Sequence, residues 1–308
     1  MSQSKAIATR GNLPHKATIN INKWEEVTCD LCTRNEASVL ATENGFSICE
    51  CNHCNLVYIN PRPSSEDLKT YYEEYYPQLD DSVVEAWNDE KPFRQISKML
   101  EQDLPAGGFV VDIGCGLGLF LKRLGESSPK WSGVGIDYDN KAIVYAQKMY
   151  STERISFACV DIMEDISFLP DRVNAVTILA CLEHMPSPQA FFKRLKRILT
   201  PGSRIYIRVP FNHFWIRFKN TCRYVPLVFG APMHLYNFSA SNLETYLAMN
   251  GFNEIKIFPG VAERQTKLTM KIASLIIKGT SSMLYIATGH HYIAPWVGSL
   301  VASGRYTG

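Results

Sequence analysis

A glycine-rich loop directly follows a hydrophobic segment in the stretch VVDIGCGLGLF, residues 110–120. Gly114, Gly116 and Gly118 occupy alternate positions, where glycine lets the backbone turn tightly and approach a ligand. A helix that begins after such a loop also presents unpaired backbone N–H groups. The spacing differs from the G-x-G-x-x-G of dinucleotide-binding proteins, because the third glycine comes one residue early. The loop therefore predicts a ligand site of another kind.

Three aspartates stand at the ends of predicted strands around this loop. Asp112 precedes the glycines, where its charge disfavours a pyrophosphate and favours a ligand with an ammonium group. Asp137 closes the segment WSGVGID and can accept hydrogen bonds from both hydroxyls of a ribose. Asp161 follows SFACV and can accept a hydrogen bond from the exocyclic amine of a purine. An ammonium group, a ribose and an adenine together describe S-adenosylmethionine.

Four cysteines near the N-terminus form two C-x2-C pairs separated by 18 residues: Cys29, Cys32, Cys51 and Cys54. Two such pairs can place four thiolates around Zn(II), and a closed four-sulfur site is structural rather than catalytic. Cys49 lies near enough to compete, but Cys51 keeps the two-residue spacing to Cys54. Four reduced cysteines without a metal are the alternative, and a redox dithiol is a further one.

Histidines near the carboxyl ends of the predicted strands are the candidate bases, because imidazole accepts a proton near neutral pH. His184 lies in CLEHMP, directly after the fourth predicted strand, and Glu183 beside it can orient the imidazole or fix the loop. His234 lies in APMHLYNF, after the fifth strand. For each histidine, a hydrogen bond within its loop is the structural alternative to a catalytic role.

The elements that must position these residues alternate between strand and helix. Hydrophobic patterning predicts strands at 109–113, 132–137, 155–159, 173–180 and 203–210, and helices from about 118, at 140–150 and at 187–199. Such alternation is typical of a parallel sheet with helices on both faces. A further helix within 239–252, a strand at 253–258 and a possible last strand at 298–306 follow.

With these motifs in this order, residues 105–260 resemble class I S-adenosylmethionine-dependent methyltransferases. The resemblance implies an α/β fold with a Rossmann-like seven-stranded sheet. It also implies that S-adenosylmethionine is the cofactor, and that the enzyme transfers its methyl group. The predicted cofactor-binding set adds the neighbours of the motif residues and comprises Asp112, Gly114, Cys115, Gly116, Gly118, Asp137, Tyr138, Asp161 and Ile162.

The sequence also suggests a division of the chain. A tail (1–24) precedes a zinc-ribbon-like module (25–63), a helical linker or lid (64–104) and the methyltransferase domain (105–308). Within that domain we expect an aromatic lid segment (211–238) and a helical insertion (262–297). The cysteine module is similar to the N-terminal part of some methyltransferases of sugar and glycan-modification pathways.

A hydroxyl of a small molecule, sugar or glycan is the expected methyl acceptor. The formal net charge of +2 provides no broad basic surface, which counts against an RNA methyltransferase that grips nucleic acid with the zinc module. The motifs are also compatible with a non-catalytic S-adenosylmethionine-binding protein or a nucleotide-dependent oxidoreductase. No signal-peptide-like segment follows Met1, so we expect a cytoplasmic protein. An amphipathic helix near 266–280 either packs on the domain or lies on a membrane surface.

Overall fold

The computed structural model describes residues 7–8, 19–21, 23–73, 90–163, 168–213, 216–217, 229–261, 280, 283, 287–288 and 298–308. The amphipathic helix predicted near 266–280, with its two alternatives of packing on the domain or lying on a membrane surface, falls outside the described residues except for residue 280. So does most of the aromatic segment between 214 and 228. Within the described ranges, no helix is long and apolar enough to cross a membrane.

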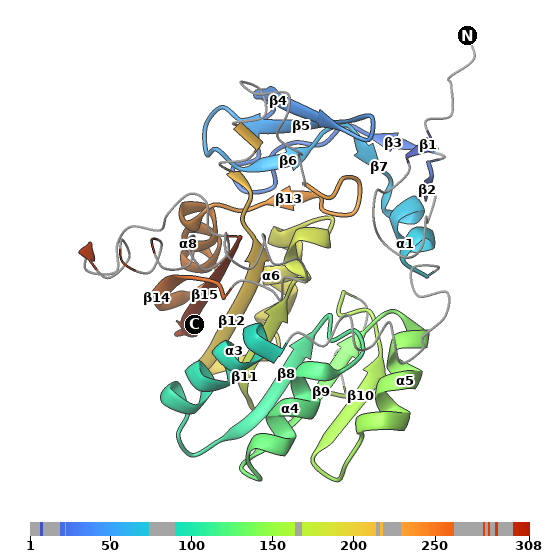
Figure 1. Ribbon diagram of the computed structural model, residues 1–308. Coiled ribbons are helices and arrows are strands. Elements are labelled where there is room, and N and C mark those ends of the chain that lie inside the picture. Colours follow the sequence, from blue (N-terminus) through green and yellow to red (C-terminus); the bar gives the residue numbers. More distant parts are fainter. Residues whose placement is uncertain are drawn as a thin grey trace.

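A seven-stranded mixed sheet is the centre of the larger part of the molecule (Figure 1). The strands lie in the order β10-β9-β8-β11-β12-β15-β14, and β15 runs antiparallel to both of its neighbours. Their bounds are β8 (Gly108–Ile113), β9 (Trp131–Asp137), β10 (Ile155–Cys159), β11 (Val173–Leu179), β12 (Leu199–Pro210), β14 (Phe252–Pro259) and β15 (Ser299–Tyr306). The predicted Rossmann-like sheet is thus confirmed.

The chain order reverses between β8 and β11, since β9 and β10 lie on one side of β8 and β11 and β12 on the other. In open α/β sheets, this reversal leaves a crevice beyond the carboxyl ends of the strands, where ligands bind. The sequence motifs with candidate chemistry follow β8, β9, β10 and β11. The topology therefore gathers them at one edge.

Helices cover the sheet and connect its strands. They are α3 (Glu90–Asp103), α4 (Leu119–Ser127), α5 (Asn140–Tyr150), α6 (Pro188–Leu195) and α8 (Ala240–Met249), with a short 3-10 turn η1 at Leu182–His184. Side chains cap several of them: Asp139 accepts the Ala142 N–H at the start of α5, and Ser239 forms a reciprocal capping box with Asn242 at the start of α8. Such caps satisfy backbone donors that the first helical turn leaves unpaired.

One expected boundary differs from the structure. The helix predicted at 187–199 ends at Leu195, and β12 begins at Leu199 rather than at residue 203. The pairing of β11 with β12 shifts register between Val173 and Ala175. A bulge therefore accommodates the Pro201-Gly202 pair within the strand instead of excluding it, which residue preferences alone do not indicate.

The cysteine module forms a second sheet of four strands in the order β13-β6-β5-β4. These strands are β4 (Ala37–Glu43), β5 (Phe46–Cys51), β6 (Val57–Ile59) and β13 (Tyr236–Asn237), and two small pairs, β1 (Ile7–Ala8) with β2 (Ile19–Asn20) and β3 (Trp24–Glu25) with β7 (Arg62–Pro63), accompany them. β13 comes from the segment after β12. The module is therefore completed by a strand from the chain's later half.

Helix α1 (Ser65–Glu73) follows the module, and the Ser64 hydroxyl accepts the Asp67 N–H at 3.1 Å at its start. Figure 1 shows α1 and the module beyond the end of the central sheet. Direct contacts join the module to the helices of the sheet. The Asp30 carboxylate accepts hydrogen bonds from the Ser187 hydroxyl at 2.6 Å, the Gln189 N–H at 2.9 Å and the Tyr246 hydroxyl at 2.9 Å.

Candidate active site and cysteine site

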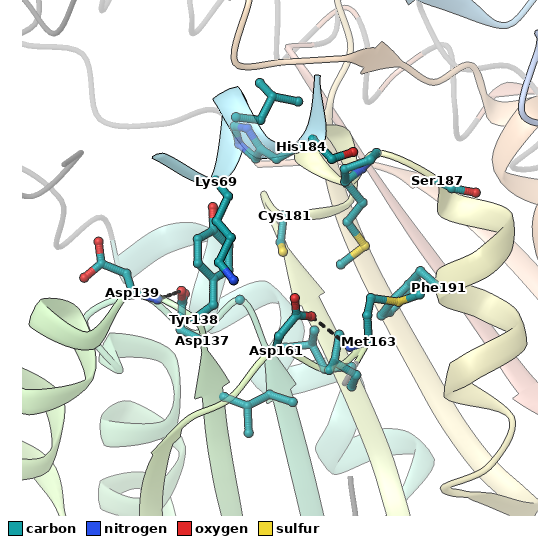
Figure 2. Close-up of a pocket in the computed structure, with 18 of the residues that line it drawn as sticks. Lys69, Asp137, Tyr138, Asp139, Asp161, Met163, Cys181, His184, Ser187 and Phe191 are labelled. Carbon is teal, nitrogen blue, oxygen red and sulfur yellow. Dashed lines mark hydrogen bonds between the residues drawn. The ribbon is translucent and has the colours of Figure 1, made fainter. Parts of the chain in front are cut away.

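A cavity of ≈ 930 Å³ opens at the carboxyl ends of the central strands. This volume lies near the upper end of the range for small-molecule sites. Figure 2 shows Asp137 and Asp161 at one end of the cavity and His184 at the other. The lining includes six residues of the predicted cofactor set, Gly114, Gly116, Asp137, Tyr138, Asp161 and Ile162, and both candidate bases, His184 and His234.

Asp137 ties the glycine loop to the end of β9. Its Oδ2 accepts the Gly116 N–H at 2.9 Å, and its Oδ1 accepts the Asp139 N–H at 3.0 Å. Burial raises the pKa of this carboxyl, while the backbone hydrogen bonds oppose that shift. A carboxylate has about four lone-pair sites. Asp137 can therefore hold the loop and still accept hydrogen bonds from the two hydroxyls of a ribose.

The glycine loop must carry glycine at its first position for two reasons. Gly114 has φ of 69°, which an L side chain rarely adopts, and a Cβ there would lie 2.3 Å from the Cys181 Sγ. The loop and the segment after β11 therefore approach one another more closely than any other residue allows. Both line the cavity.

Three predicted cofactor ligands, Asp112, Cys115 and Gly118, are not among the residues that line the cavity. Asp112 is 2% exposed and accepts the Thr177 hydroxyl at 2.6 Å, and burial raises its pKa to about 7. A Cβ at Gly118 would lie 2.5 Å from the Phe157 ring. Gly118 thus serves the packing of α4 on the sheet, and the cofactor roles of all three residues stay predictions.

Asp161 and Ile162 lie directly after β10 and line the cavity. The Asp161 Oδ1 accepts the Met163 N–H at 2.8 Å, which fixes the turn after the strand. The other carboxylate oxygen can accept a hydrogen bond from a ligand amine. This placement agrees with a site at the third strand end, although the role in adenine binding stays a prediction.

Glu183, His184 and His234, hereafter the His–Glu cluster, come together although the two histidines are 50 residues apart in sequence. Their ligand atoms all lie within 4.8 Å of one another, and the two imidazole rings meet edge to face at 4.8 Å between centroids. Glu183 is 1% exposed, and its Oε1 lies 3.9 Å from the His184 Nε2.

The tautomer of both imidazoles follows from their hydrogen bonds. The His184 Nδ1 donates to the Met233 carbonyl at 2.9 Å, and the His234 Nδ1 donates to the Phe229 carbonyl at 2.6 Å. A carbonyl oxygen only accepts, so the proton of each neutral ring is on Nδ1. In the neutral rings the lone pairs are therefore on the Nε2 atoms.

The loop that carries His234 is fixed by the cysteine module. The Glu43 carboxylate, at the end of β4, accepts three backbone N–H groups, from Phe229 at 3.1 Å and from Gly230 and Ala231 at 2.9 Å each. The Asn44 amide donates to the Ala231 carbonyl at 2.8 Å. The module therefore supports one wall of the cavity, because this loop also supplies the carbonyl that orients His234.

Helix α1 forms part of the cavity wall, which no sequence motif indicates. Ser65, Glu66, Leu68 and Lys69 all line the cavity, and Figure 2 shows Lys69 extending from α1 into it. The segment 64–104 is predicted to be a helical linker or lid, but no local pattern singles out Lys69. Its position depends on how α1 packs, which the neighbouring residues in sequence do not specify.

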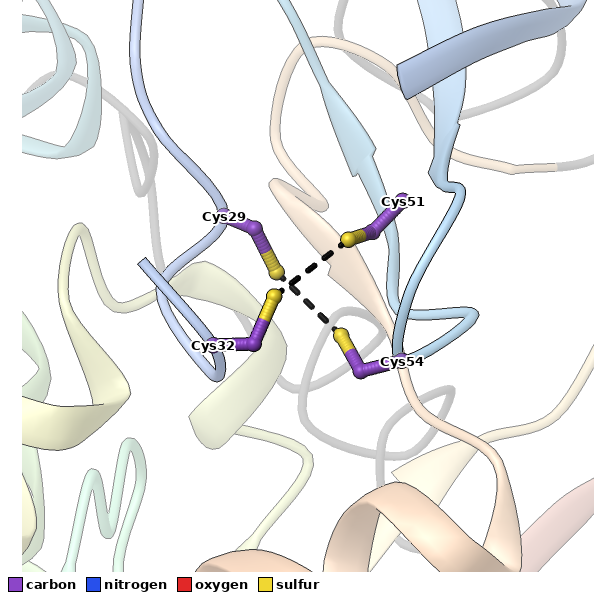
Figure 3. A group of neighbouring side chains, drawn as sticks. All are labelled: Cys29, Cys32, Cys51 and Cys54. Atoms are coloured by element: carbon purple, nitrogen blue, oxygen red, sulfur yellow. Dashed lines mark hydrogen bonds between the residues drawn. The ribbon is translucent and has the colours of Figure 1, made fainter. Parts of the chain in front are cut away.

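The four cysteine sulfurs converge as the spacing predicts (Figure 3). The Sγ atoms of Cys29 and Cys54 are 3.3 Å apart, and those of Cys32 and Cys51 are 3.4 Å apart. A tetrahedral zinc with bonds of about 2.3 Å separates its sulfurs by roughly 3.8 Å. Burial raises the pKa of Cys54 to about 11. In the number and spacing of its sulfurs, the cluster has the donor set and nearly the dimensions for Zn(II).

Cys49 does not belong to this group. Its thiol donates to the Asn60 carbonyl at 3.5 Å, and the four-sulfur set contains only the residues of the two C-x2-C pairs. Cys49 and Cys51 lie on the same face of β5, but Cys51 is the last residue of the strand, and the turn after it brings Cys51 beside Cys54. The preference for Cys51 over Cys49 agrees with this geometry.

Comparison with known proteins extends these observations. A family model described as a methyltransferase domain matches residues 84–257, more than half of the chain. The ubiquinone biosynthesis O-methyltransferase of Idiomarina loihiensis is 30% identical over 100 residues, which cover 32% of this chain and 41% of that protein. The match therefore spans less than half of that relative's length.

Two solved structures share the fold at low sequence identity. The plantazolicin methyltransferase BamL, in complex with a triazolic desmethylPZN analog and SAH, has a TM-score of 0.51 and 16% identity, covering 79% of this chain and 97% of that one. A putative S-adenosylmethionine-dependent methyltransferase from Listeria monocytogenes has a TM-score of 0.50 and 15% identity, covering 71% and 99%.

Proposed function

This chain belongs to the methyltransferase-domain family as an S-adenosylmethionine-dependent enzyme, and on that premise we propose that it methylates a hydroxyl of a small molecule or sugar. One observation carries the proposal. A cavity of ≈ 930 Å³ joins the glycine loop and the strand-end aspartates to a pair of imidazoles that hold their protons on Nδ1.

The cofactor end of this cavity has the donors and acceptors that S-adenosylmethionine needs. Asp137 would accept hydrogen bonds from the ribose hydroxyls and Asp161 one from the adenine amine, and the backbone at Gly114 and Gly116 would contact the methionine part. When bound, this cofactor supplies an electrophilic methyl group on a sulfonium. The protein contributes the alignment of the acceptor atom with that methyl group, which is the main source of rate in such a displacement.

An oxygen acceptor is favoured for a chemical reason. A hydroxyl must lose its proton as its oxygen gains the methyl group, and the His–Glu cluster is the group that handles this proton. Glu183 is buried beside the His184 Nε2 and compensates positive charge there. The relative from Idiomarina loihiensis is itself named an O-methyltransferase, which supports oxygen over nitrogen or carbon.

The cysteine module has a separate role in this proposal. We propose that Cys29, Cys32, Cys51 and Cys54 bind a structural Zn(II) that holds the module together. Glu43 and Asp30 connect the module to the acceptor side of the cavity. Glu43 accepts hydrogen bonds from the backbone of the 229–231 loop, and Asp30 accepts hydrogen bonds from the start of α6.

The test is calorimetric titration with S-adenosylmethionine and with NAD, followed by measurement of S-adenosylhomocysteine formation over a panel of phenols, sugars, nucleotide sugars and amines. We expect binding of S-adenosylmethionine alone and turnover with hydroxyl compounds. Turnover with amines only would refute the oxygen acceptor. Cofactor binding without turnover on any class would favour a non-catalytic binding protein.

A further inference from the structure

We infer that the methyl acceptor carries an acid group, a carboxylate or a phosphate, and that Lys69 of α1 binds this group. The inference rests on the proposed function and narrows its acceptor to hydroxyl compounds that are also acids. An acid group is negatively charged near neutral pH, so a cavity that binds it must supply a positive side chain or unpaired backbone N–H groups.

The first observation concerns the charges of the cavity wall. Among the described residues that line the cavity, Lys69 is the one lysine or arginine. The residue is exposed, and Figure 2 shows its side chain extending from α1 into the cavity, between the end with Asp137 and the end with His184. The carboxylates that line the same cavity belong to Glu66, Asp137, Asp139 and Asp161.

The second observation is that the Lys69 ammonium has no ion pair or hydrogen bond within the part of the chain that the structure describes. Glu66 lies three residues earlier on α1 and lines the same cavity. Side chains at this helical spacing are neighbours, yet the two charges are not paired. The Lys69 ammonium is therefore available for a negative group that a ligand brings.

The backbone donors of the glycine loop are already used. The N–H groups of Gly114 and Cys115 both donate to the Ile136 carbonyl, at 2.8 Å and 3.1 Å. The Gly116 N–H donates to the Asp137 carboxylate at 2.9 Å. Loops of this kind bind anions through unpaired N–H groups. The first part of this loop therefore has no donor left for an acid group.

The start of α6 is occupied as well. Ser187 and Ala190 line the cavity, and helix N-termini are common anion sites. Here the Gln189 N–H donates to the Asp30 carboxylate at 2.9 Å. The Ala190 N–H donates to the Ser187 hydroxyl at 3.2 Å, and Pro188 has no N–H. A carboxylate of the cysteine module thus takes the place that a ligand anion would need.

A second positive charge lies behind the cavity wall. Arg62 is 8% exposed, and its Nη1 donates to the Pro186 carbonyl at 2.8 Å and to the Tyr236 hydroxyl at 3.0 Å. Pro186 lines the cavity. Within the described residues, no carboxylate pairs with this guanidinium, and its Nε has no hydrogen-bond partner. A buried charge without a counter-charge lowers the stability of the fold, so an anion in the cavity would stabilise Arg62 as well.

The cofactor adds to this attraction. S-adenosylmethionine has a sulfonium and an ammonium against a single carboxylate, so it brings net positive charge into a cavity lined by carboxylates. An acid should therefore bind more tightly once the cofactor is in place. Methyl transfer leaves a neutral thioether, which weakens the hold on the methylated acid and favours its release.

The experiment is calorimetric titration of the full chain saturated with sinefungin, an analogue in which an amine replaces the sulfonium. The probes are pairs that differ in one acid group: glycerol phosphate with glycerol, and para-hydroxybenzoate with para-hydroxybenzyl alcohol. We expect at least one acid to bind about fivefold or more tightly than its neutral partner. Lys69→Gln should remove this difference, and Lys69→Arg should largely restore it.

Two matched variants control for charge and position. Lys148→Gln removes the same charge from an exposed residue of α5 that does not line the cavity, and it should keep the affinity for the acid. Glu66→Gln removes a negative charge near Lys69 and should raise that affinity by up to about threefold. High salt should weaken acid binding to the wild type and leave the neutral probes unaffected. A purely structural role of Lys69 would not produce these opposite signs.

Equal affinities within both pairs, no binding of either acid, or acid binding that Lys69→Gln leaves unchanged would overturn the inference. Loss of S-adenosylmethionine affinity in Lys69→Gln would also overturn it, because Lys69 would then bind the carboxylate of the cofactor. Turnover with neutral hydroxyl compounds alone would overturn the acid group and leave the proposed O-methylation in place. Acid binding that needs Lys69, in a protein that does not bind S-adenosylmethionine, would refute the proposed function and leave the acid site standing.

Discussion

The proposed cofactor side and the proposed acceptor side of the cavity are built differently. The cofactor side comes from consecutive strand ends, with Gly114, Gly116, Asp137 and Asp161 all within about 50 residues of chain. The acceptor side comes from distant segments: α1, the turn after β11 and the loop at 229–234, which Glu43 holds from the cysteine module. The cofactor side is thus local and carried by the sheet, whereas the acceptor side depends on how separate parts pack.

The largest effect is expected from removing the metal of the cysteine module, which tests whether the cofactor side is independent of that module. Cys54→Ser should release its zinc and lower the stability of the module greatly, since structural zinc contributes roughly 10 kcal/mol or more in small metal-dependent folds. The affinity for S-adenosylmethionine should stay within about threefold, because the cofactor side is held by the sheet. Elemental analysis, limited proteolysis and calorimetry measure the three quantities.

Cys49→Ser is the control, because its thiol lies outside the four-sulfur set. It should keep the zinc content of the wild type. If Cys54→Ser lost cofactor affinity in parallel with its metal, the two halves of the cavity would not be independent.

A second change tests the acceptor side directly. His184→Ala should lower turnover by about 10²- to 10⁴-fold, the usual contribution of a positioned proton-handling group. Cofactor affinity should be unchanged, because the imidazole lies at the other end of the cavity from Asp137. Steady-state kinetics and calorimetry give this split, and His213→Ala should leave both values near those of the wild type. A loss of cofactor affinity without a loss of turnover would place His184 on the cofactor side instead of the acceptor side.

On the cofactor side, Asp137→Ala should weaken S-adenosylmethionine binding by roughly 1–3 kcal/mol. The variant loses the acceptor for the ribose and also the hydrogen bond that positions Gly116. Calorimetry measures the change, with exposed Asp171→Ala as control. Unchanged affinity would be incompatible with a ribose ligand at this position.

The smallest expected effect concerns Glu43. Glu43→Gln keeps one acceptor oxygen but places an N–H2 group against backbone donors, so the 229–231 loop should shift and turnover should fall by about tenfold. Cofactor affinity should not change. Glu36→Gln, on the same module with a 64% exposed side chain, is the matched control, and steady-state kinetics show whether kcat falls while cofactor binding stays constant. Equal turnover in the two variants would show that the module does not position His234.

The central sheet is predictable from the sequence because its signals are local. Buried strands such as β8 are largely apolar, with Asp112 the one charged residue in it, and the helices between them have recognisable caps such as Asp139 and Ser239. The strand β4 is not predictable in this way, because its burial pattern is irregular and its pairing with β5 shifts register between Val39 and Ala41. A pattern of period two cannot identify such a strand.

By itself, the sequence determined which strand-end residues gather on one side of the cavity and which four sulfurs converge. In each case residues at a fixed spacing along the chain come close in space, through a strand-to-helix loop, successive parallel strand ends, and two C-x2-C turns. Only the tertiary structure decided the acceptor side. It brought Lys69 into the cavity, paired β13 with β6, and placed His234 against His184 across 50 residues. These contacts depend on the packing of whole elements, for which no short stretch of sequence carries the information.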